Sequence, residues 1–257
     1  MNCPGVGLRL ALVLASSLVI GGLSGCGSLG KRSGVDLGPD ASESTADVYV
    51  ALAGEYYALG QLEVAQQRVN QALKEDANNP KAHMVSALIS QRLGEAGKAE
   101  EAFKRAAELA PKDGDIRNAL GAFYCDQRRY PEAEEQFRQA AANPLYATPW
   151  FAQTNAGICA KGAGDPAKAR GYYRQALASN PNFGPAVLAS VELDLAQGDG
   201  RSASALLAQY FKTSPPTAQA LALGVRVERE LGNKKAAASY ATMLKQRYPN
   251  SAEARSL

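Results

Sequence analysis

The sequence predicts an all-α protein in which six similar helix pairs stack into a solenoid. An alanine recurs at intervals of 34 residues, with one interval of 36, and a second alanine ladder follows seven residues further on. The first ladder consists of Ala65, Ala99, Ala133, Ala169, Ala203 and Ala237. The second ladder consists of Ala72, Ala106, Ala140 and Ala176. Residues seven apart lie on one helix face, where small side chains let a neighbouring helix approach closely. A period of this length predicts helix–turn–helix repeats.

The alanine ladders divide the chain into six repeats and a short tail. The repeats span 46–79, 80–113, 114–149, 150–183, 184–217 and 218–251, and the tail is 252–257. Each helix pair of such a chain buries its apolar face only against its neighbours. We therefore expect a continuous stack without strands.

Glycines and prolines mark the helix ends at matching positions of the repeats. The first helices end in a glycine suited to a left-handed cap, except in the third repeat, which has Arg128. These glycines are Gly60, Gly94, Gly164, Gly198 and Gly232. The second helices are followed by prolines, which cannot continue a helix, at Pro111, Pro144, Pro181, Pro215 and Pro249. Pro131 and Asp165-Pro166 suit the first turns of two second helices.

This spacing resembles the tetratricopeptide repeat, which implies a right-handed superhelical solenoid whose curved inner wall binds other proteins. In that family, certain repeat positions face the core. Those positions are held here by Leu52, Phe103, Leu120, Tyr124, Phe137 and Tyr173. We expect these side chains to be buried by packing, without a direct role in binding.

Four apolar side chains are expected on the inner wall near the start of the solenoid. In the tetratricopeptide family, the positions of Val50, Tyr57, Met84 and Leu88 face inward. An apolar stripe outside the core is costly to expose, so we predict that it binds an apolar segment of a partner protein. The alternative is that neighbouring turns bury these side chains, since single apolar residues on a surface need no explanation.

Residues 1–25 have the pattern of an export signal, with one charge at Arg9 and an apolar run too short to span a bilayer comfortably. The run Leu23-Ser24-Gly25-Cys26 resembles a bacterial lipobox. That resemblance implies cleavage before Cys26, followed by attachment of three acyl chains to this residue. Three chains would hold the protein on a membrane in effect permanently. Residue 27 is Gly, where Asp would imply retention at the inner membrane, so we expect the periplasmic face of the outer membrane.

Residues 26–45 are predicted to join the lipid anchor to the repeats as a flexible tether. The segment contains four Gly, one Pro and several Ser, without apolar periodicity. A chain of this length spans roughly 25 Å, which lets the repeats reach a partner in the same membrane.

Charge and composition argue against nucleic acid, a small-molecule substrate, a cofactor and catalysis. Removing residues 1–25 takes away one basic residue and leaves 27 basic against 25 acidic residues, a balance of +2. Nucleic-acid binding favours a strongly basic face. The single histidine, His83, is expected to be a half-buried, hydrogen-bonded core residue. One histidine cannot build the usual metal cluster, and no Gly-rich loop follows a strand, so we expect no metal site and no enzyme activity.

Cys125 and Cys159 are the two cysteines left to pair after processing. They lie 34 residues apart in the first helices of consecutive repeats, and the axes of packed helices lie about 8–10 Å apart. The periplasm is oxidising, so we predict a disulfide between them. The alternative is that both are small buried hydrophobic residues.

Several stretches resemble the PilW family, also called PilF, of type IV pilus biogenesis and stability lipoproteins. They are the run Asn143-Pro144-Leu145-Tyr146, which lies in the one interval that is two residues longer than the others, the contexts of the cysteines at 121–125 and 155–159, and the stretch 223–226 of the last repeat. The resemblance implies a pilotin, which helps the pilus secretin, a multimeric outer-membrane channel, to reach the outer membrane and assemble there. Pilus biogenesis and twitching motility would depend on it. The alternative is a tetratricopeptide adaptor lipoprotein for outer-membrane barrel assembly or for the regulation of cell-wall enzymes.

Overall fold

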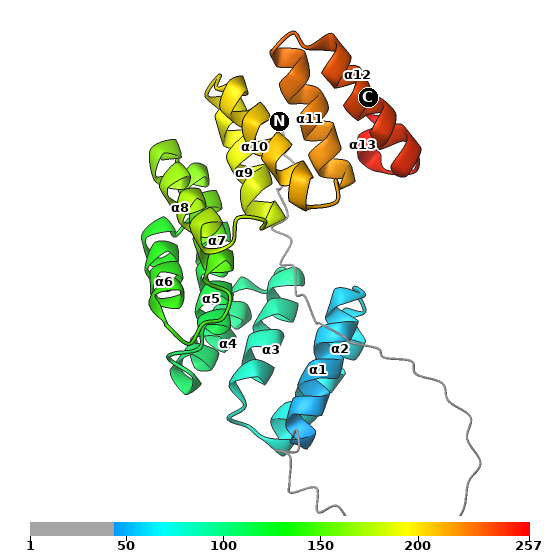
Figure 1. The fold of residues 1–257 in the computed structure, drawn as a ribbon. Coiled ribbons are helices and arrows are strands. Elements are labelled where there is room, and N and C mark those ends of the chain that lie inside the picture. The colour runs from blue at the N-terminus through cyan, green and yellow to red at the C-terminus, as the bar shows by residue number, and fades with distance from the viewer. Residues whose placement is uncertain (1–43) are drawn as a thin grey trace, which may run out of the picture. The chain divides into compact units, whose positions relative to one another are not determined.

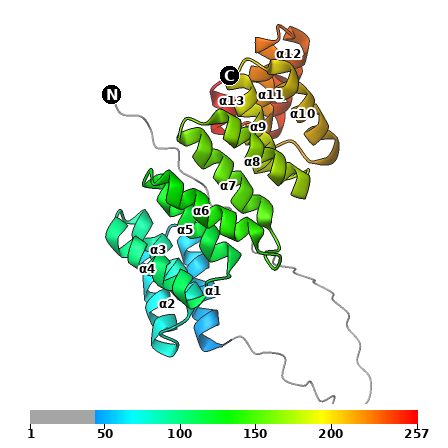
Figure 2. The same ribbon diagram turned by 90° about the vertical axis from the view of Figure 1, so that its left-hand side faces the viewer.

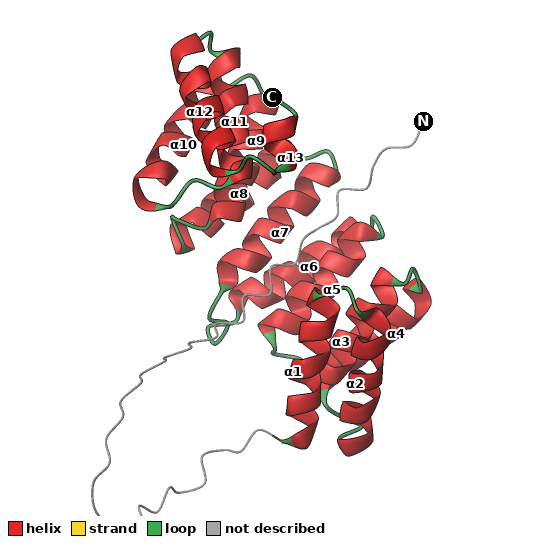
Figure 3. Cartoon of the chain, turned by 90° about the vertical axis from the view of Figure 1, so that its right-hand side faces the viewer, coloured by secondary structure: helices red, strands yellow, loops and turns green. Residues whose placement is uncertain are grey.

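The computed structural model describes residues 44–257, which form thirteen helices and contain no strand (Figures 1 and 3). The helices are α1 Thr45–Ala58, α2 Leu62–Glu75, α3 Pro80–Arg92, α4 Ala96–Leu109, α5 Gly114–Asp126, α6 Tyr130–Ala142, α7 Pro149–Gly162, α8 Pro166–Ser179, α9 Gly184–Ala196, α10 Gly200–Thr213, α11 Ala218–Glu230, α12 Lys234–Arg247 and α13 Ala252–Arg255. The predicted export signal, Cys26 and nearly all of the predicted tether lie outside the described residues.

The first twelve helices form the six predicted pairs, stacked in chain order (Figures 1 and 2). Two boundaries differ by one residue: α1 begins at Thr45, assigned above to the tether, and α7 begins at Pro149. The predicted tail contains one further helical turn, α13, which contacts α11 and α12. The all-α fold of stacked pairs is confirmed.

The first helices of the pairs form one continuous wall. The backbone of each of α1, α3, α5, α7 and α9 lies close to that of the next first helix. Among the described second helices, α6 and α8 meet only through long side chains, where Lys168 and Tyr172 bond Glu134, and α10 and α12 meet only where the Phe211 ring packs against Tyr240. Helices that contact one another lie on the side where the stack is tighter. The inner wall therefore consists of first helices, and the second helices diverge on the outside.

The alanine ladders and the predicted aromatic residues form the core. Every alanine of both ladders is buried, and so are the predicted core side chains other than Leu52. Alanine lets the backbones of paired helices approach, and the Phe137 and Tyr173 rings lie against Gly121 and Gly157 of the first helix of the same pair. The two predicted kinds of core position are confirmed.

The prediction for Leu52 is wrong, because its side chain is 40% exposed. The residues at the same position in the third, fourth and sixth repeats, Leu120, Ala156 and Gly224, are buried, and in those repeats a preceding second helix contacts the first helix. Within residues 44–257, α1 contacts only α2 and α3, so no preceding helix covers this side of α1.

The five predicted glycine caps adopt the left-handed conformation, with φ from 74° to 85°. Arg128 occupies the same place with φ 60°, and it is the one positive-φ residue other than glycine in the described part of the chain. The side chain of Asp165 accepts a hydrogen bond from the Lys168 N–H, as expected for the N-cap of α8. Local chemistry thus sets the ends of these helices.

Candidate functional site

The inner wall near α1 and α3 is less accessible than the sequence suggested. Val50 and Leu88 are only 8% and 6% exposed, so the premise that they lie outside the core is wrong. Val50 belongs to a core cluster that also contains Val69 and Val85. For Val50 and Leu88, the structure agrees with the alternative interpretation, in which neighbouring parts of the chain bury both side chains.

Tyr57 and Met84 remain half-buried on the contacting helices α1 and α3. The Tyr57 ring packs in part against the core cluster, and the Arg92 guanidinium carbon lies 5.3 Å from its centroid. Arg92 Nη1 also donates to the Tyr57 carbonyl oxygen at 3.3 Å. These contacts hold the ring at the junction of the first two repeats. Of the four predicted partner-binding side chains, these two can offer surface to a partner.

Further along the wall, polar side chains connect consecutive first helices. The amide of Gln91 donates to Asp126 at 2.8 Å, and Asn155 donates to Asn118 at 2.9 Å. Such contacts hold neighbouring first helices in register. The wall therefore changes from apolar packing in the first repeat to amide and carboxylate groups in the middle repeats.

A charged cluster centred on Arg129 joins the second and third repeats. Glu100 Oε1 lies 2.8 Å from both Lys104 Nζ and Arg129 Nη1. Hydrogen bonds from Lys104 and Arg129 hold the pKa of the Glu100 carboxyl below its ordinary value. The Arg129 guanidinium also lies 4.3 Å from the centroid of the Tyr124 ring. This cluster supports the stack, and its acid is fully paired.

Buried acids occur at two later junctions between repeats. Burial raises the pKa of Asp194, while Arg170, whose Nη1 lies 2.6 Å from Asp194 Oδ1, opposes that shift. Glu228 accepts hydrogen bonds from Ser204 Oγ at 2.6 Å and Asn233 Nδ2 at 2.7 Å. Each acid bonds a side chain from the preceding second helix or the following turn, so both serve packing between repeats.

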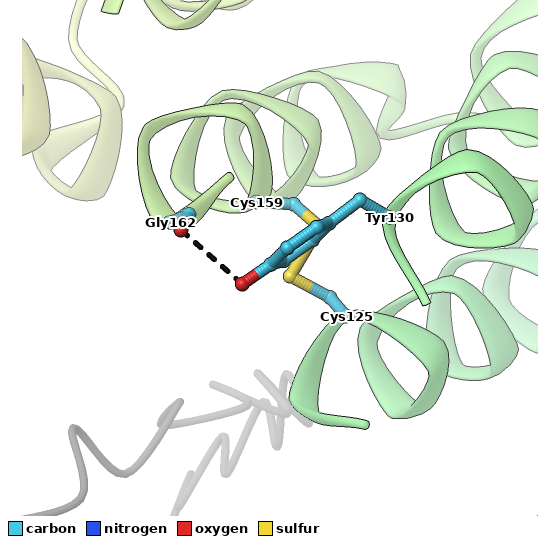
Figure 4. The surroundings of a disulfide bond; sticks show 4 residues. All are labelled: Cys125, Tyr130, Cys159 and Gly162. Atoms are coloured by element: carbon cyan, nitrogen blue, oxygen red, sulfur yellow. Dashed lines mark hydrogen bonds between the residues drawn. A yellow bond between two sulfur atoms is a disulfide. The ribbon is translucent and has the colours of Figure 1, made fainter. Parts of the chain in front are cut away.

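Cys125 and Cys159 form a disulfide that joins the first helices α5 and α7 (Figure 4). Their Cα atoms lie 5.7 Å apart, within the usual range for a disulfide. The Tyr130 hydroxyl donates to the Gly162 carbonyl oxygen at 3.2 Å and so links α6 of the third repeat to α7 as well. The covalent bond spans the boundary between the third and fourth repeats.

The two-residue insertion precedes α7 and is tied to the third repeat. Asn143 Nδ2 donates to the Lys112 carbonyl oxygen at 2.5 Å, and Asn143 Oδ1 accepts from the Leu145 N–H at 2.9 Å. The buried Tyr146 ring lies against Gly114, where any Cβ would overlap it. The insertion thus fills a gap that only glycine leaves open, and the side chain of Leu145 points into solvent, 86% exposed.

The remaining candidates for chemistry are structural. His83 is half-buried, and its Nε2 lies 3.0 Å from the Ala77 carbonyl oxygen, so the prediction of a satisfied packing residue is confirmed. Residues 44–257 contain no cluster of three or more His, Cys, Asp or Glu that could bind a metal ion. None of the helices in the described range has the length and apolar character needed to cross a membrane.

Sequence reasoning missed the exposed apolar residues on the other side of α1. Val48 and Leu52 are 43% and 40% exposed, and Leu59 is 69% exposed directly after the helix. The sequence did hold a signal for them. The first repeat has no predicted helix before it, so Val48 and Leu52 lack the cover that a preceding repeat would give, whereas Leu59 lies in the turn, where its counterpart Leu93 is also exposed.

Models of the tetratricopeptide repeat match residues 50–114, 87–147 and 160–227. Together these matches include more than half of the chain. They agree with the helix pairs seen in the structure.

Two pilus proteins are similar to this chain over most of their length. The crystal structure of PilW, a widely conserved type IV pilus biogenesis factor, has 31% identity and a TM-score of 0.70, covering 84% of this chain and 99% of that chain. The type IV pilus assembly protein PilF of Pseudomonas aeruginosa is 27% identical over 246 residues, which is 96% of each protein. A solved structure of Pseudomonas aeruginosa PilF has a TM-score of 0.67 and 26% identity, covering 82% of this chain and 95% of that chain.

Proposed function

We propose that this chain, which belongs to the tetratricopeptide-repeat family of type IV pilus biogenesis proteins represented by PilW and PilF, is a pilotin anchored to the outer membrane by lipid. It binds the pilus secretin and promotes the localisation and multimerisation of that channel, and pilus biogenesis and twitching motility follow from this. The observation that carries the proposal is the similarity to PilW, which extends over nearly the whole PilW chain.

The tetratricopeptide fold is a scaffold for protein interaction, and the chain is not an enzyme. Its work is therefore binding, and the inner wall offers Tyr57 and Met84 beside the polar groups of the middle repeats. A wall with both kinds of group suits an extended segment whose apolar side chains enter near α1 and whose backbone continues along the amides.

Two sequence features outside the described residues support the membrane part of the proposal. The lipobox-like run ending at Cys26 supplies a site for acylation, and the Gly-rich stretch after it supplies reach. A lipid-held carrier on a flexible tether can accompany an aggregation-prone channel subunit to the outer membrane. The anchor would also keep carrier and client on the same surface during assembly.

The test of the anchor is Cys26→Ser, with Cys3→Ser as the matched control inside the segment expected to be removed. We expect Cys26→Ser to leave the secretin monomeric, or at the inner membrane, in fractionated cells and unboiled gels, while Cys3→Ser leaves its multimers unchanged. Unchanged multimers in Cys26→Ser, together with no secretin cross-linked to the wild type, would overturn the proposal. General envelope defects with normal pili would instead favour an adaptor for barrel assembly or cell-wall enzymes.

The test of the wall is the double substitution Tyr57→Glu and Met84→Glu. We expect it to abolish recovery of the secretin in a cross-linked pull-down, because two charges would have to be buried against an apolar segment. Gln246→Glu, on the exposed surface of α12, serves as the control for added charge. Full recovery with the double variant would show that the secretin does not bind at these two residues.

A further inference from the structure

We propose that the outer face of α1 is a docking surface for an amphipathic helix of a partner protein, which carries a Lys or Arg opposite Glu55. The outer face consists of Val48, Leu52, Glu55 and Leu59, all exposed. These residues are spaced by four, three and four positions, which places them along one side of a helix. The face is separate from the inner wall that contains Tyr57 and Met84.

Two positions of this face, those of Val48 and Glu55, are buried in every later repeat of this chain, whereas the position of Leu59 is not, since its counterpart Leu93 is 51% exposed. Val48 is 43% exposed, whereas the residues at the same position of the five later repeats are all fully buried. These residues are Ala82, Ile116, Ala152, Ala186 and Ala220. The fold therefore uses this side of a first helix as a packing surface five times and leaves it open once.

A helix covers this side in each of the five buried cases. The second helix of each repeat contacts the first helix of the next repeat. These contacts join α2 to α3, α4 to α5, α6 to α7, α8 to α9 and α10 to α11. No helix in residues 44–257 stands in that relation to α1, which contacts only α2 and α3. The outer face thus continues an interface that the chain itself repeats, and the occupant that fits it is a helix.

Glu55 sets the charge of that occupant. The corresponding residues of the later repeats are uncharged and nearly or fully buried, namely Ile89, Phe123, Cys159, Leu193 and Val227. Glu55 is exposed, and its carboxylate has no ion-pair partner within residues 44–257. A helix packed over it would bury an unpaired charge unless it brought a cation. The partner helix therefore carries a basic residue between apolar ones.

A second copy of the chain fits this slot poorly. At the far end of the solenoid α13 contacts both α11 and α12, so it takes the place where a following first helix would begin. The exposed surface of α12 is also polar and includes Lys235, Ser239, Thr242 and Gln246. Stacking a second copy onto α1 would bring polar groups against Val48 and Leu52.

The preceding part of the chain is a poor source of the helix as well. Residues 27–43 contain four Gly and one Pro, and each of these residues disfavours a helix of three turns. A helix from another protein is the occupant that satisfies shape and charge together. This inference concerns a surface other than the inner wall, and it does not depend on which protein the inner wall binds.

The experiment places a photo-crosslinking amino acid at Leu52 of the full-length protein in cells that produce it naturally, with the same amino acid at Gln246 as the control. The cross-linked peptide is identified by mass spectrometry and synthesised. We expect a peptide of another protein with apolar residues at helical spacing around one Lys or Arg. Cross-links to residues 27–43, to a second copy or to a peptide without this pattern, or none above the Gln246 control, would overturn the proposal.

Binding of the labelled synthetic peptide by fluorescence anisotropy then tests the two parts of the surface. We expect Val48→Glu to weaken binding about tenfold, because apolar burial is lost. Glu55→Lys should weaken binding of the same peptide about twofold to fivefold. A second peptide, in which Glu replaces the basic residue, should bind the Glu55→Lys variant with restored affinity but should not bind the wild type as well. Both variants should unfold at the wild-type temperature, since both side chains are exposed. Absence of the charge rescue would contradict the assigned role of Glu55.

Discussion

The ring of Tyr173 in α8 lies directly against the backbone of Gly157 in α7, at a place where any Cβ would overlap the ring. The ring is fully buried, so it has no free space into which to move. We predict that Gly157→Ala lowers the free energy of unfolding by about 1–3 kcal/mol, as overpacking of a core does. Urea denaturation of purified residues 44–257 measures the change.

Gly171 provides the matched control, because it lies within α8 and a Cβ there would meet no atom within 4 Å. Gly171→Ala should raise the free energy of unfolding by roughly 0.5–1 kcal/mol, since alanine favours the helix more than glycine does. If both variants changed stability in the same direction, the contact with Tyr173 would not explain the requirement for Gly157.

The disulfide between Cys125 and Cys159 closes a loop across 34 positions of the chain. We predict that replacing both cysteines by Ala lowers the free energy of unfolding by about 3 kcal/mol, mainly because the unfolded chain gains freedom. Dithiothreitol should destabilise the wild type by a similar amount and leave the double variant unchanged. Two thiols that react with an alkylating agent in the untreated, denatured wild type, seen by mass spectrometry, would show that the bond does not form.

Arg128 adopts φ 60° at the end of the first helix of the third repeat, where the other repeats with this turn have glycine. A side chain in the left-handed region is strained, so we expect Arg128→Gly to raise the free energy of unfolding by about 0.5–1 kcal/mol. The neighbouring Gln127 has φ −80°, and Gln127→Gly should lower stability by a few tenths of a kcal/mol or more because nothing is relieved there. Equal effects of the two substitutions in a thermal denaturation series would rule out strain at Arg128.

The Glu100 carboxylate makes its stability contribution only while it is ionised. Hydrogen bonds from Lys104 and Arg129 lower its pKa in the folded protein, so the contribution is complete above its ordinary pKa of 4.5 and is lost as the pH falls through the lowered value. We expect Glu100→Gln to cost about 0.5–1 kcal/mol at pH 7, and much less at pH 2–3.

Glu101→Gln is the control for that substitution, because Glu101 is exposed and forms no ion pair within the described part of the chain. Urea denaturation of both variants and the wild type across this pH range provides the comparison. A deficit of Glu100→Gln that stayed constant with pH would mean that packing, and not charge, explains the effect.

The repeat boundaries followed from sequence with an error of at most one residue at the starts of the first helices. The reason is that each boundary depends on local chemistry: a left-handed glycine such as Gly164, an N-cap such as Asp165 and a proline that follows the second helix. Six copies of the same pattern also correct one another. A single departure, such as Arg128, was therefore identified as a variant of the turn and not as a missing repeat.

The accessible residues of the candidate site were predicted less accurately than the helix boundaries, because the accessibility of a side chain is not a local property. Val50 and Leu52 lie two residues apart in α1, and the sequence placed the first on the accessible wall and the second in the core. The structure has the opposite arrangement. Val50 faces the cluster formed with α2 and α3, whereas Leu52 faces the side that a preceding repeat would cover.

By itself the sequence determined the helices, their ends and the order in which they stack, because caps, turns and alanine spacing act within a few residues or repeat at a constant interval. Only the tertiary structure decided which face of α1 is open. Burial depends on the neighbours that surround a helix, and α1 has neighbours on one side only among the described residues. A pattern averaged over six repeats cannot represent the one repeat whose surroundings differ.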